Sequence, residues 1–234
     1  MTLLDVRDVA KRFGETWALR GASFSVRSGE VLGLIGPNGS GKTTLLECLA
    51  GLLAADAGDI RMNGEVSPPS RRRDALFYMP DGIIPWPDQT VGWVLSFSSD
   101  AQGGRADASL DVQRELSLET LLPRRVGALS KGQRRRLLLA LALLTPQPLL
   151  LLDEPFDGLD LRQTGEVSAL LRRVAASGRT LLLSIHQLSD AMKVCDRLVL
   201  LSDGRAVGEG TLAELQAQAG MPHASLEEVF LALT

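Results

Sequence analysis

Apolar positions in the first third of the chain alternate or cluster in short runs, and these runs predict β-strands. The early strands are expected at residues 3–9, 16–19, 23–26 and 31–35, with a turn at 27–30. Leu45, Leu46 and Leu49 then fall on one face of a helix at 42–50, which Gly51 ends. The pattern therefore predicts an antiparallel β-layer that leads into a buried strand and a helix.

The rest of the chain carries both periods. Further strands are expected at residues 60–66, 75–79, 149–152, 180–184 and 198–201, and helices at 90–97, 109–116, 134–144, 161–176, 189–195, 211–219 and 225–233. Thr211 and Ser225 suit helix N-caps, and Glu228 gives Ser225 the spacing of a capping box. Asp203 and Gly204 predict a hairpin turn after the last strand.

Three polar stretches interrupt these elements. They are predicted to form surface loops at the basic run 71–73, the proline-rich 80–87 and the polar 98–107, the last a flexible loop with Gly103 and Gly104. Because the mainly helical residues lie between strands of one pattern, we expect a single α/β domain over residues 1–234. A helical subdomain at about 88–145 is predicted to be inserted into its core.

The most informative motif lies between the strand at 31–35 and the helix at 42–50. Residues 36–43 read Gly-Pro-Asn-Gly-Ser-Gly-Lys-Thr and match the P-loop pattern GxxxxGK[ST] at every fixed position. Glycines let the backbone turn and bring N–H groups close to an anion at a helix N-terminus. Lys42 is placed to reach the outer phosphates of a nucleotide, and the Thr43 hydroxyl to ligate magnesium. The flanking strand and helix disfavour a glycine-rich turn that binds nothing.

Composition and charge exclude several other classes of protein. The net charge of the 234 residues is −3, which argues against a general nucleic-acid binder. Cys48 and Cys195 are far apart and are expected to be free thiols in a reducing compartment. The longest apolar run, 137–144, is far shorter than the roughly 20 residues that span a bilayer, and we find no secretory signal. We therefore expect a cytoplasmic protein that acts at a membrane only through another chain.

An acidic pair, Asp153 and Glu154, follows the continuous apolar run at 149–152. Such a run is typical of a strand buried on both faces, and ligands bind at the carboxyl ends of these strands. Two adjacent acids cannot point the same way. One is expected to face a metal held by Thr43 and the other to take a proton from an attacking water. A surface pair without a role is the alternative.

Residues 129–133, Leu-Ser-Lys-Gly-Gln, resemble the LSGGQ signature of ATP-binding-cassette (ABC) ATPases. The order of P-loop, signature, acidic strand and Asp-Gly-Leu-Asp at 157–160 also resembles this family, with Asp160 in the position of its D-loop. His186 follows a predicted strand, at the place of the family's switch histidine. The resemblance covers essentially the whole chain. It implies a P-loop NTPase (RecA-like) core with an antiparallel β subdomain and an inserted helical subdomain.

The resemblance also implies roles for single residues. ATP would be wrapped by Asn38, Gly39, Ser40, Gly41, Lys42, Thr43 and Thr44. Thr43 and Asp153 would hold Mg²⁺, and Glu154 would be the general base. His186 would contact the γ-phosphate, with a satisfied polar residue at a helix start as the alternative. Phe13 by itself favours packing over stacking on a base, but the resemblance makes it the adenine-stacking ring.

In this family two ATPase chains dimerise head to tail, and each signature closes over the partner's nucleotide. The residues that would do so here are Ser130, Lys131, Gly132 and Gln133. Two positions depart from the family pattern. Asp81 replaces the Q-loop glutamine and remains a candidate metal ligand, with altered magnesium affinity or coupling expected. Lys131 replaces the first signature glycine, a change that is tolerable beside a partner's γ-phosphate.

The function that this resemblance implies is ATP hydrolysis by a transporter subunit on the cytoplasmic face of the membrane. The subunit is expected to form a dimer of two identical chains and to drive a separate integral membrane permease. Trp86, Trp93 and Phe97 lie near the expected permease groove or else in the core. Residues 225–230 resemble the ending of ATPases paired with export-type permeases. The alternatives are a non-transport ABC ATPase, for example in iron–sulfur assembly, and a nucleotide-binding regulator with little turnover.

Overall fold

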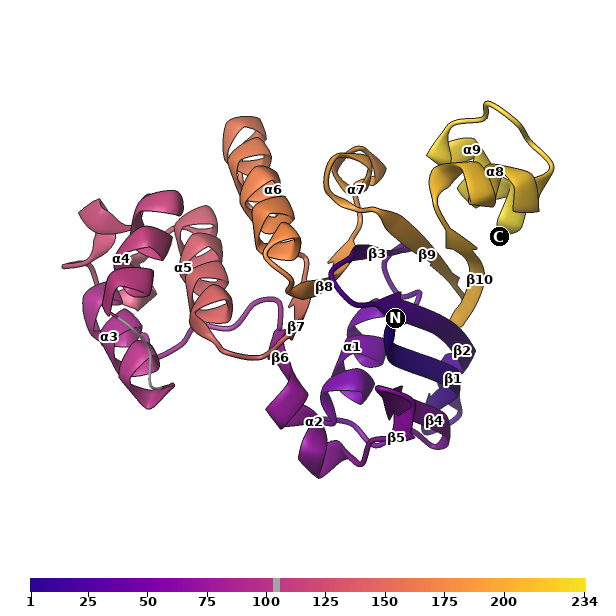
Figure 1. The fold of residues 1–234 in the computed structure, drawn as a ribbon, viewed down its shortest axis with the longest axis horizontal. Helices are drawn as coiled ribbons and strands as arrows, with labels where there is room; N and C mark the ends of the chain where they lie inside the picture. Colours follow the sequence, from indigo (N-terminus) through magenta and orange to yellow (C-terminus); the bar gives the residue numbers. More distant parts are fainter. Residues whose placement is uncertain (103–105) are drawn as a thin grey trace.

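The computed structural model describes residues 1–102 and 106–234 and is built around a six-stranded, mostly parallel sheet (Figure 1). In spatial order this sheet contains β10 (Arg205–Gly210), β9 (Arg197–Ser202), β3 (Val31–Ile35), β8 (Thr180–Ile185), β7 (Leu149–Asp153) and β6 (Leu76–Met79). The strands from β9 to β6 run parallel, and β10 pairs antiparallel with β9. The carboxyl ends of the parallel strands therefore meet at one edge of the sheet.

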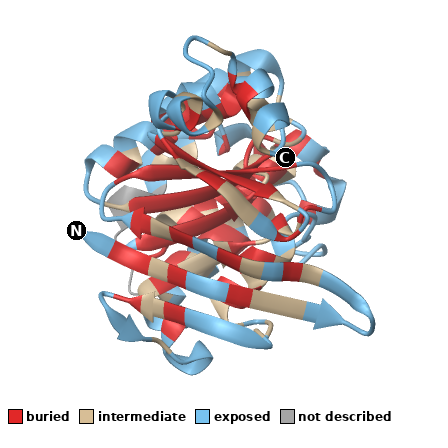
Figure 2. Cartoon of the chain, turned by 90° about the vertical axis from the view of Figure 1, so that its right-hand side faces the viewer, coloured by how far each residue is buried: buried red, intermediate tan, exposed pale blue. Residues whose placement is uncertain are grey.

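The parallel strands are buried on both faces. In β7, Leu150 and Leu152 pack into one hydrophobic cluster, whereas Leu149 and Leu151 pack into another on the opposite face. Successive side chains of a strand point to opposite faces, so only a continuous apolar run can fill both layers. In Figure 2 these buried strands form the centre of the molecule, and exposed residues cover its outside.

A second, antiparallel sheet covers the P-loop side of the core. Its spatial order is β2 (Thr16–Arg27), β1 (Thr2–Phe13), β4 (Ala57–Met62) and β5 (Glu65–Val66). The prediction of two strands within 16–26 is wrong, because β2 is continuous and β1 extends to Phe13. Register shifts and a positive φ at Gly21 bend this pair without ending it. The predicted strand at 60–66 is interrupted, because Asn63 and Gly64, which both have positive φ, form a turn between the end of β4 at Met62 and the start of β5 at Glu65.

Helices complete both faces of the parallel sheet. They are α1 (Lys42–Ala50), α2 (Pro69–Ala75), α3 (Val91–Ala101), α4 (Ala106–Glu115), α5 (Lys131–Leu144), α6 (Leu161–Ala176), α7 (Leu188–Val194), α8 (Leu212–Ala219) and α9 (Leu226–Leu233), with 3₁₀ turns at Glu119–Leu121 and Val126–Ala128. Apolar residues of α1 share a cluster with the antiparallel sheet, and those of α3 and α5–α9 share the other. Figure 1 shows α3, α4 and α5 grouped at the end of the molecule opposite the C-terminus.

The predicted loop at 98–107 is wrong at both ends. Residues 98–101 belong to α3, and α4 begins at Ala106. Gly103 and Gly104 lie outside the described residues. Because Ser98, Ser99 and Asp100 are polar, their pattern concealed a helix that packs through its earlier turns.

The basic run at 71–73 is also not a solvated loop. It lies in α2, and the side chain of Arg72 is buried. Its guanidinium donates hydrogen bonds to the carbonyl oxygens of Cys48, at 2.6 Å, and Ser67, at 2.9 Å. Arg71 and Arg73 remain exposed. Because α2 packs against α1, only one of these three positions is buried. All three residues are arginine, so the sequence does not show which one.

The last two helices start as predicted. Thr211 caps α8 with Glu214, and Ser225 caps α9 with Glu228, both as capping boxes. Cys48 and Cys195 are free thiols, as expected. Among the helices of residues 1–102 and 106–234, none is long and apolar enough to cross a membrane.

Candidate nucleotide site

The loop between β3 and α1 approaches its neighbours so closely that two of its glycines admit no side chain. A Cβ on Gly36 would lie 2.3 Å from the carbonyl oxygen of Leu201. A Cβ on Gly41, which has φ 105°, would lie 2.5 Å from the carbonyl oxygen of Ala18. The loop is therefore fixed by backbone contacts on two sides. Its N–H groups line a cradle at the start of α1, the arrangement that suits a phosphate.

Lys42 reaches back over this loop. Its ammonium donates to the carbonyl oxygens of Gly36, at 2.8 Å, and Pro37, at 3.2 Å. Burial lowers the pKa of Lys42, and the negative charges of Glu154 and Asp153 oppose that shift. A buried ammonium held only by carbonyl oxygens is well placed to exchange them for phosphate oxygens.

Asp153 ends β7 as a fully buried carboxylate surrounded by hydroxyl donors. The Thr43 hydroxyl donates to its Oδ2 at 2.9 Å, so α1 and β7 meet at the predicted metal site. The Ser184 hydroxyl, in β8, donates to Oδ1, and the Tyr78 hydroxyl lies 3.4 Å from Oδ2. Burial and the charge of Asp153 raise the pKa of Tyr78, which keeps its phenol protonated as a donor.

Glu154 follows with its backbone in the left-handed region, at φ 50°. A non-glycine residue in this region carries backbone strain, which clusters at functional sites. The Glu154 N–H donates to Ser184 Oγ at 2.9 Å, which anchors the turn to β8. His186 Nδ1 lies 2.6 Å from Glu154 Oε2. The predicted base and the predicted switch histidine are therefore in direct contact, and both retain access to solvent.

A cavity of about 300 Å³ joins most of the predicted nucleotide residues. It is lined by Ala18, Asn38, Gly39, Gly41, Lys42, Thr43, Thr44, Asp81 and Glu154. Ser40 is buried beneath the loop, and its hydroxyl finds no hydrogen-bond partner among the described residues. A cradle that excludes a Cβ, a cation and an unpaired hydroxyl together fit a polyphosphate.

Phe13 is not among the residues that line this cavity. It is half exposed at the end of β1, and the ammonium of Lys11 is 5.6 Å from its ring centroid. The packing alternative for Phe13 does not fit this exposure, and its role as the adenine-stacking ring stays a prediction. Phe13 pairs with Thr16 across the hairpin, so both side chains lie on one face of the sheet. The next residue, Trp17, points to the opposite face.

The signature residues lie apart from the cavity. Ser130 is the N-cap of α5, and its hydroxyl accepts the Gln133 N–H at 3.3 Å, while Gln133 Oε1 accepts the Ser130 N–H at 3.0 Å. Ser130 and Lys131 are exposed, but Gly132 is buried. Asp160 caps α6 in the same way, with Oδ1 2.8 Å from the Gln163 N–H. Within one chain, these groups do not meet the cavity-lining residues.

Comparison with known proteins decides the family. A family model described as ABC transporter matches residues 19–157, which is more than half of the chain. The chain belongs to the ABC transporter family. The matched range includes the P-loop, the signature and the acidic pair, while His186 lies beyond it.

Relatives of this ABC protein agree along almost its whole length. Nod factor export ATP-binding protein I of Burkholderia orbicola is 40% identical over 233 residues, covering 96% of this chain and 72% of the relative. The protein of that name from Ralstonia nicotianae is 37% identical over 225 residues, covering 91% and 68%. This chain is accordingly the ATP-binding and ATP-hydrolysing subunit of an ABC transporter. The non-transport and regulator alternatives are not favoured.

Solved structures agree on the fold. An ATP-binding subunit of an ABC transporter aligns with a TM-score of 0.89 and 31% identity and covers 99% of both chains. A bacterial Atm1-family ABC exporter with ATP bound has a TM-score of 0.84 and 23% identity, covering 99% of this chain and 41% of the exporter. At that identity the exporter shows the fold alone. The P-loop NTPase fold predicted for this ABC subunit is thus confirmed.

Several contacts of the ABC subunit's site were not predicted from the sequence. Tyr78 and Ser184 bond Asp153, and Arg135 pairs with Asp81 and donates to the Asp153 carbonyl oxygen. Tyr78 and Ser184 stand in strands that the apolar pattern identified, where a polar residue at the carboxyl end is a usable hint. Arg135 is one of three consecutive arginines, and nothing in that run distinguishes it.

Proposed function

We propose that this subunit binds MgATP between its own P-loop and the signature corner of a second, identical chain, and hydrolyses it to drive a membrane permease. The observation that carries the proposal is the pairing of Thr43 with Asp153 next to the contact of Glu154 with His186. The carboxylates of two adjacent residues, Asp153 and Glu154, are thereby held in different surroundings. One is buried among hydroxyl donors and the other faces solvent, as a metal ligand and a proton acceptor require.

The chain's own residues divide the work. The loop N–H groups and Lys42 hold the phosphates, and Thr43 with Asp153 would hold Mg²⁺, which neutralises phosphate charge when bound. Glu154 accepts the proton of the attacking water through its Oε2 or Oε1. His186 contacts the Glu154 carboxylate through Nδ1 and is partly exposed, and it would contact the γ-phosphate of the bound nucleotide. Phe13 offers its half-exposed ring to the adenine.

Support for a head-to-tail dimer comes from the exposed start of α5. Ser130, Lys131 and the N-terminus of α5 form a second corner suited to an anion. Neither residue is among those that line the nucleotide cavity of the same chain. A second chain supplies what one chain lacks: Ser130, Gly132 and Gln133 on one side, and the P-loop on the other. In this arrangement residues 1–234 form one nucleotide-binding domain, with residues 88–145 as its inserted helical subdomain.

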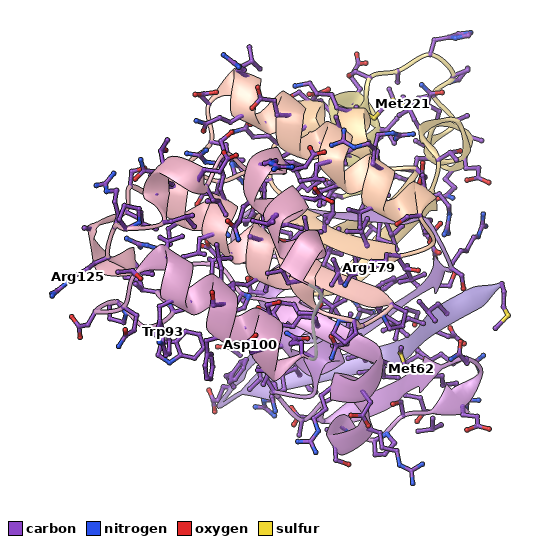
Figure 3. The ribbon with its side chains drawn as sticks, turned by 60° about the vertical axis from the view of Figure 1, so that its left-hand side comes forward. Met62, Trp93, Asp100, Arg125, Arg179 and Met221 are labelled. Atoms are coloured by element: carbon purple, nitrogen blue, oxygen red, sulfur yellow. The ribbon has the colours of Figure 1, made fainter. Side chains whose placement is uncertain are left out.

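An exposed aromatic surface suits the permease. The rings of Trp86, Trp93 and Phe97 pack together with centroids 5.0–6.0 Å apart, and each is more than 40% exposed. Trp93 stacks on Phe97, and Trp86 meets both rings edge to face. The alternative that they lie in the core is therefore wrong. Figure 3 shows Trp93 pointing outward from α3, the helix that also carries Asp100. A cytoplasmic loop of the permease would cover this surface, and Trp93→Ser is expected to abolish co-purification with the permease; retention would contradict the assignment.

The names of relatives support export as the direction of transport. The similar proteins of Burkholderia orbicola and Ralstonia nicotianae are both named for Nod factor export, and we infer export by the complete transporter, with this subunit at the inner face of the membrane where ATP is supplied. The exported molecule is selected by the permease. Cells that lack this subunit should accumulate the cargo internally; accumulation outside would contradict export.

The central experiment is Glu154→Gln, which keeps the size of the side chain and removes the proton acceptor. We expect turnover to fall about a hundredfold or more, while ATP binding, followed by equilibrium dialysis, remains. With MgATP the variant should accumulate as a dimer in light scattering. A variant that hydrolyses ATP normally, or stays monomeric at saturating MgATP, would contradict the proposal.

A further inference from the structure

Four charged side chains of alternating sign form a continuous row between the loop after β6 and the start of α5. Asp81 pairs with Arg135, Arg135 lies 3.7 Å from Asp157, and Asp157 lies 2.6 Å from Lys131. The two ends of this row, Asp81 and Lys131, are the two positions at which the sequence departs from the pattern it resembles. The departures therefore belong to one structural unit.

Arg135 is the centre of the row. Its side chain is only 3% exposed. Besides its ion pairs, it donates to the carbonyl oxygens of Asp153, at 3.1 Å, and Asp157, at 3.4 Å. A buried guanidinium is stable only when its donors are paired, so its position is dictated by the loops after β6 and β7. Conversely, one side chain of α5 fixes both loops and the main chain of the buried Asp153.

The Lys131 end is packed as well as paired. A Cβ on Gly158 would lie 2.8 Å from Lys131 Cγ, and a Cβ on Gly132 would lie 2.4 Å from the Gly158 carbonyl oxygen. The first turn of α5 thus rests on the loop that carries Asp157, with glycine at both points of contact. Lys131 is 65% exposed, so this ion pair contributes little by itself. The buried Arg135 end determines the geometry.

The position of Asp81 suits two roles, ligation of a metal ion and pairing with Arg135. It lines the cavity with Thr43 and Glu154, as a metal ligand would. Its carboxylate is nevertheless engaged by Arg135, which neutralises the charge that a metal would require. The carboxylate that Thr43 contacts is that of Asp153. Asp81 is linked to Asp153 through Arg135, which pairs with the Asp81 carboxylate and donates to the Asp153 carbonyl oxygen.

We propose that Asp81, Arg135 and Asp157 are positioning residues that hold the Asp81 loop, the Asp153 strand end and the signature turn of α5 as one body, and that Asp81 acts through Arg135 instead of ligating magnesium. This inference rests on the proposed function of the same site. It assigns the row a role in presenting the Ser130 corner to the partner's nucleotide. A shift of the loop at Asp81 is transmitted to α5 by the guanidinium.

Kinetics of Asp81→Asn separate the two roles. With a positioning role, kcat falls about tenfold, the KM for ATP changes less than twofold, and the magnesium concentration for half-maximal turnover is unchanged. Asp81→Glu, which keeps the charge, restores most of kcat. Asp88→Asn, an exposed acid of the same loop, is the matched control and should match the parent. A tenfold rise in the magnesium requirement of Asp81→Asn would overturn the proposal and make Asp81 a metal ligand.

A double-mutant cycle tests the coupling. In an Arg135→Gln background, adding Asp81→Asn should change kcat less than about twofold, because the pair is already broken. Independent, multiplying effects would contradict the proposal. Should Arg135→Gln fail to fold, hydrogen exchange of Asp81→Asn alone decides: the amides of residues 131–136 should exchange faster than in the parent and in Asp88→Asn. Unchanged protection there would equally overturn it.

The exchange measurement needs no turnover. It therefore separates a failure of this inference from a failure of the proposed function. If the parent protein hydrolysed no ATP together with its permease, the proposed function would be wrong. The positioning role of the charged row would still be measurable by hydrogen exchange.

Discussion

Two helix starts of this ATPase are both candidate anion sites, but they are built differently. At α1 the N-cap is Gly41, whose residue type offers no capping side chain, and the first-turn N–H groups border the cavity. At α5 the N-cap is Ser130, which forms a capping box with Gln133. One helix start is left open for a ligand by its own chain. The other is capped by its own chain and, in the dimer we propose, would contact the phosphates of a partner's nucleotide.

The lysine at each helix start is also placed differently. Lys42 is buried and bonded to carbonyl oxygens of the loop, so its charge is directed at the phosphate cradle. Lys131 is exposed and ion-paired with Asp157. The P-loop cradle is thus formed within one chain, whereas the start of α5 is exposed and satisfied by its own side chains. In the dimer we propose, this difference would let the signature corner bind and release the partner's nucleotide in each cycle.

The largest effect is expected from breaking each half in a separate chain. Lys42→Ala removes the phosphate cation, and Ser130→Arg blocks the exposed corner; each homodimer should lose at least about a hundredfold in turnover. Mixed in equal amounts, the two variants should recover about a quarter of the parent rate. Random pairing places both in about half of the dimers, each with one complete site of two. A mixture as inactive as its components would contradict a shared site.

Stability is the next largest effect, and it concerns the P-loop half. Arg72→Met leaves the Cys48 carbonyl oxygen at the end of α1 without its buried donor. We expect the free energy of unfolding to fall by about 3 kcal/mol in urea denaturation. Arg73→Met, on the exposed face of the same helix, is the matched control and should stay within about 0.5 kcal/mol of the parent. Equal losses would mean that the burial of Arg72 is unimportant.

A smaller effect distinguishes the faces of the hairpin next to the P-loop. Phe13→Ala should weaken ATP binding about tenfold, because a base loses its stacking partner. Trp17→Ala removes a comparably exposed ring from the opposite face and should leave the dissociation constant unchanged. Isothermal titration with ATP measures both. If Trp17→Ala were the more damaging change, the adenine would lie on the other face.

The sequence identified the parts of the site that depend on local geometry. The P-loop at 36–43 needs glycines at fixed positions, and the run at 149–152 needs four apolar residues in succession, so both leave a legible pattern. The capping residues Thr211 and Ser225 were predicted for the same reason, since their bonds span three residues. The continuity of β2 and the buried helix position of Arg72 were missed, because neither depends on near neighbours in the chain.

By itself, then, the sequence determined where the phosphate cradle, the acidic pair and the helix caps lie, since each is set by backbone conformation within a few residues. Tertiary structure alone decided which of the three arginines 134–136 is buried against Asp81 and which hydroxyls surround Asp153. Those contacts join residues that are 31 to 110 positions apart in the sequence. Burial makes each pairing strong, but a one-dimensional pattern records only that a polar residue is present and not which distant partner it meets.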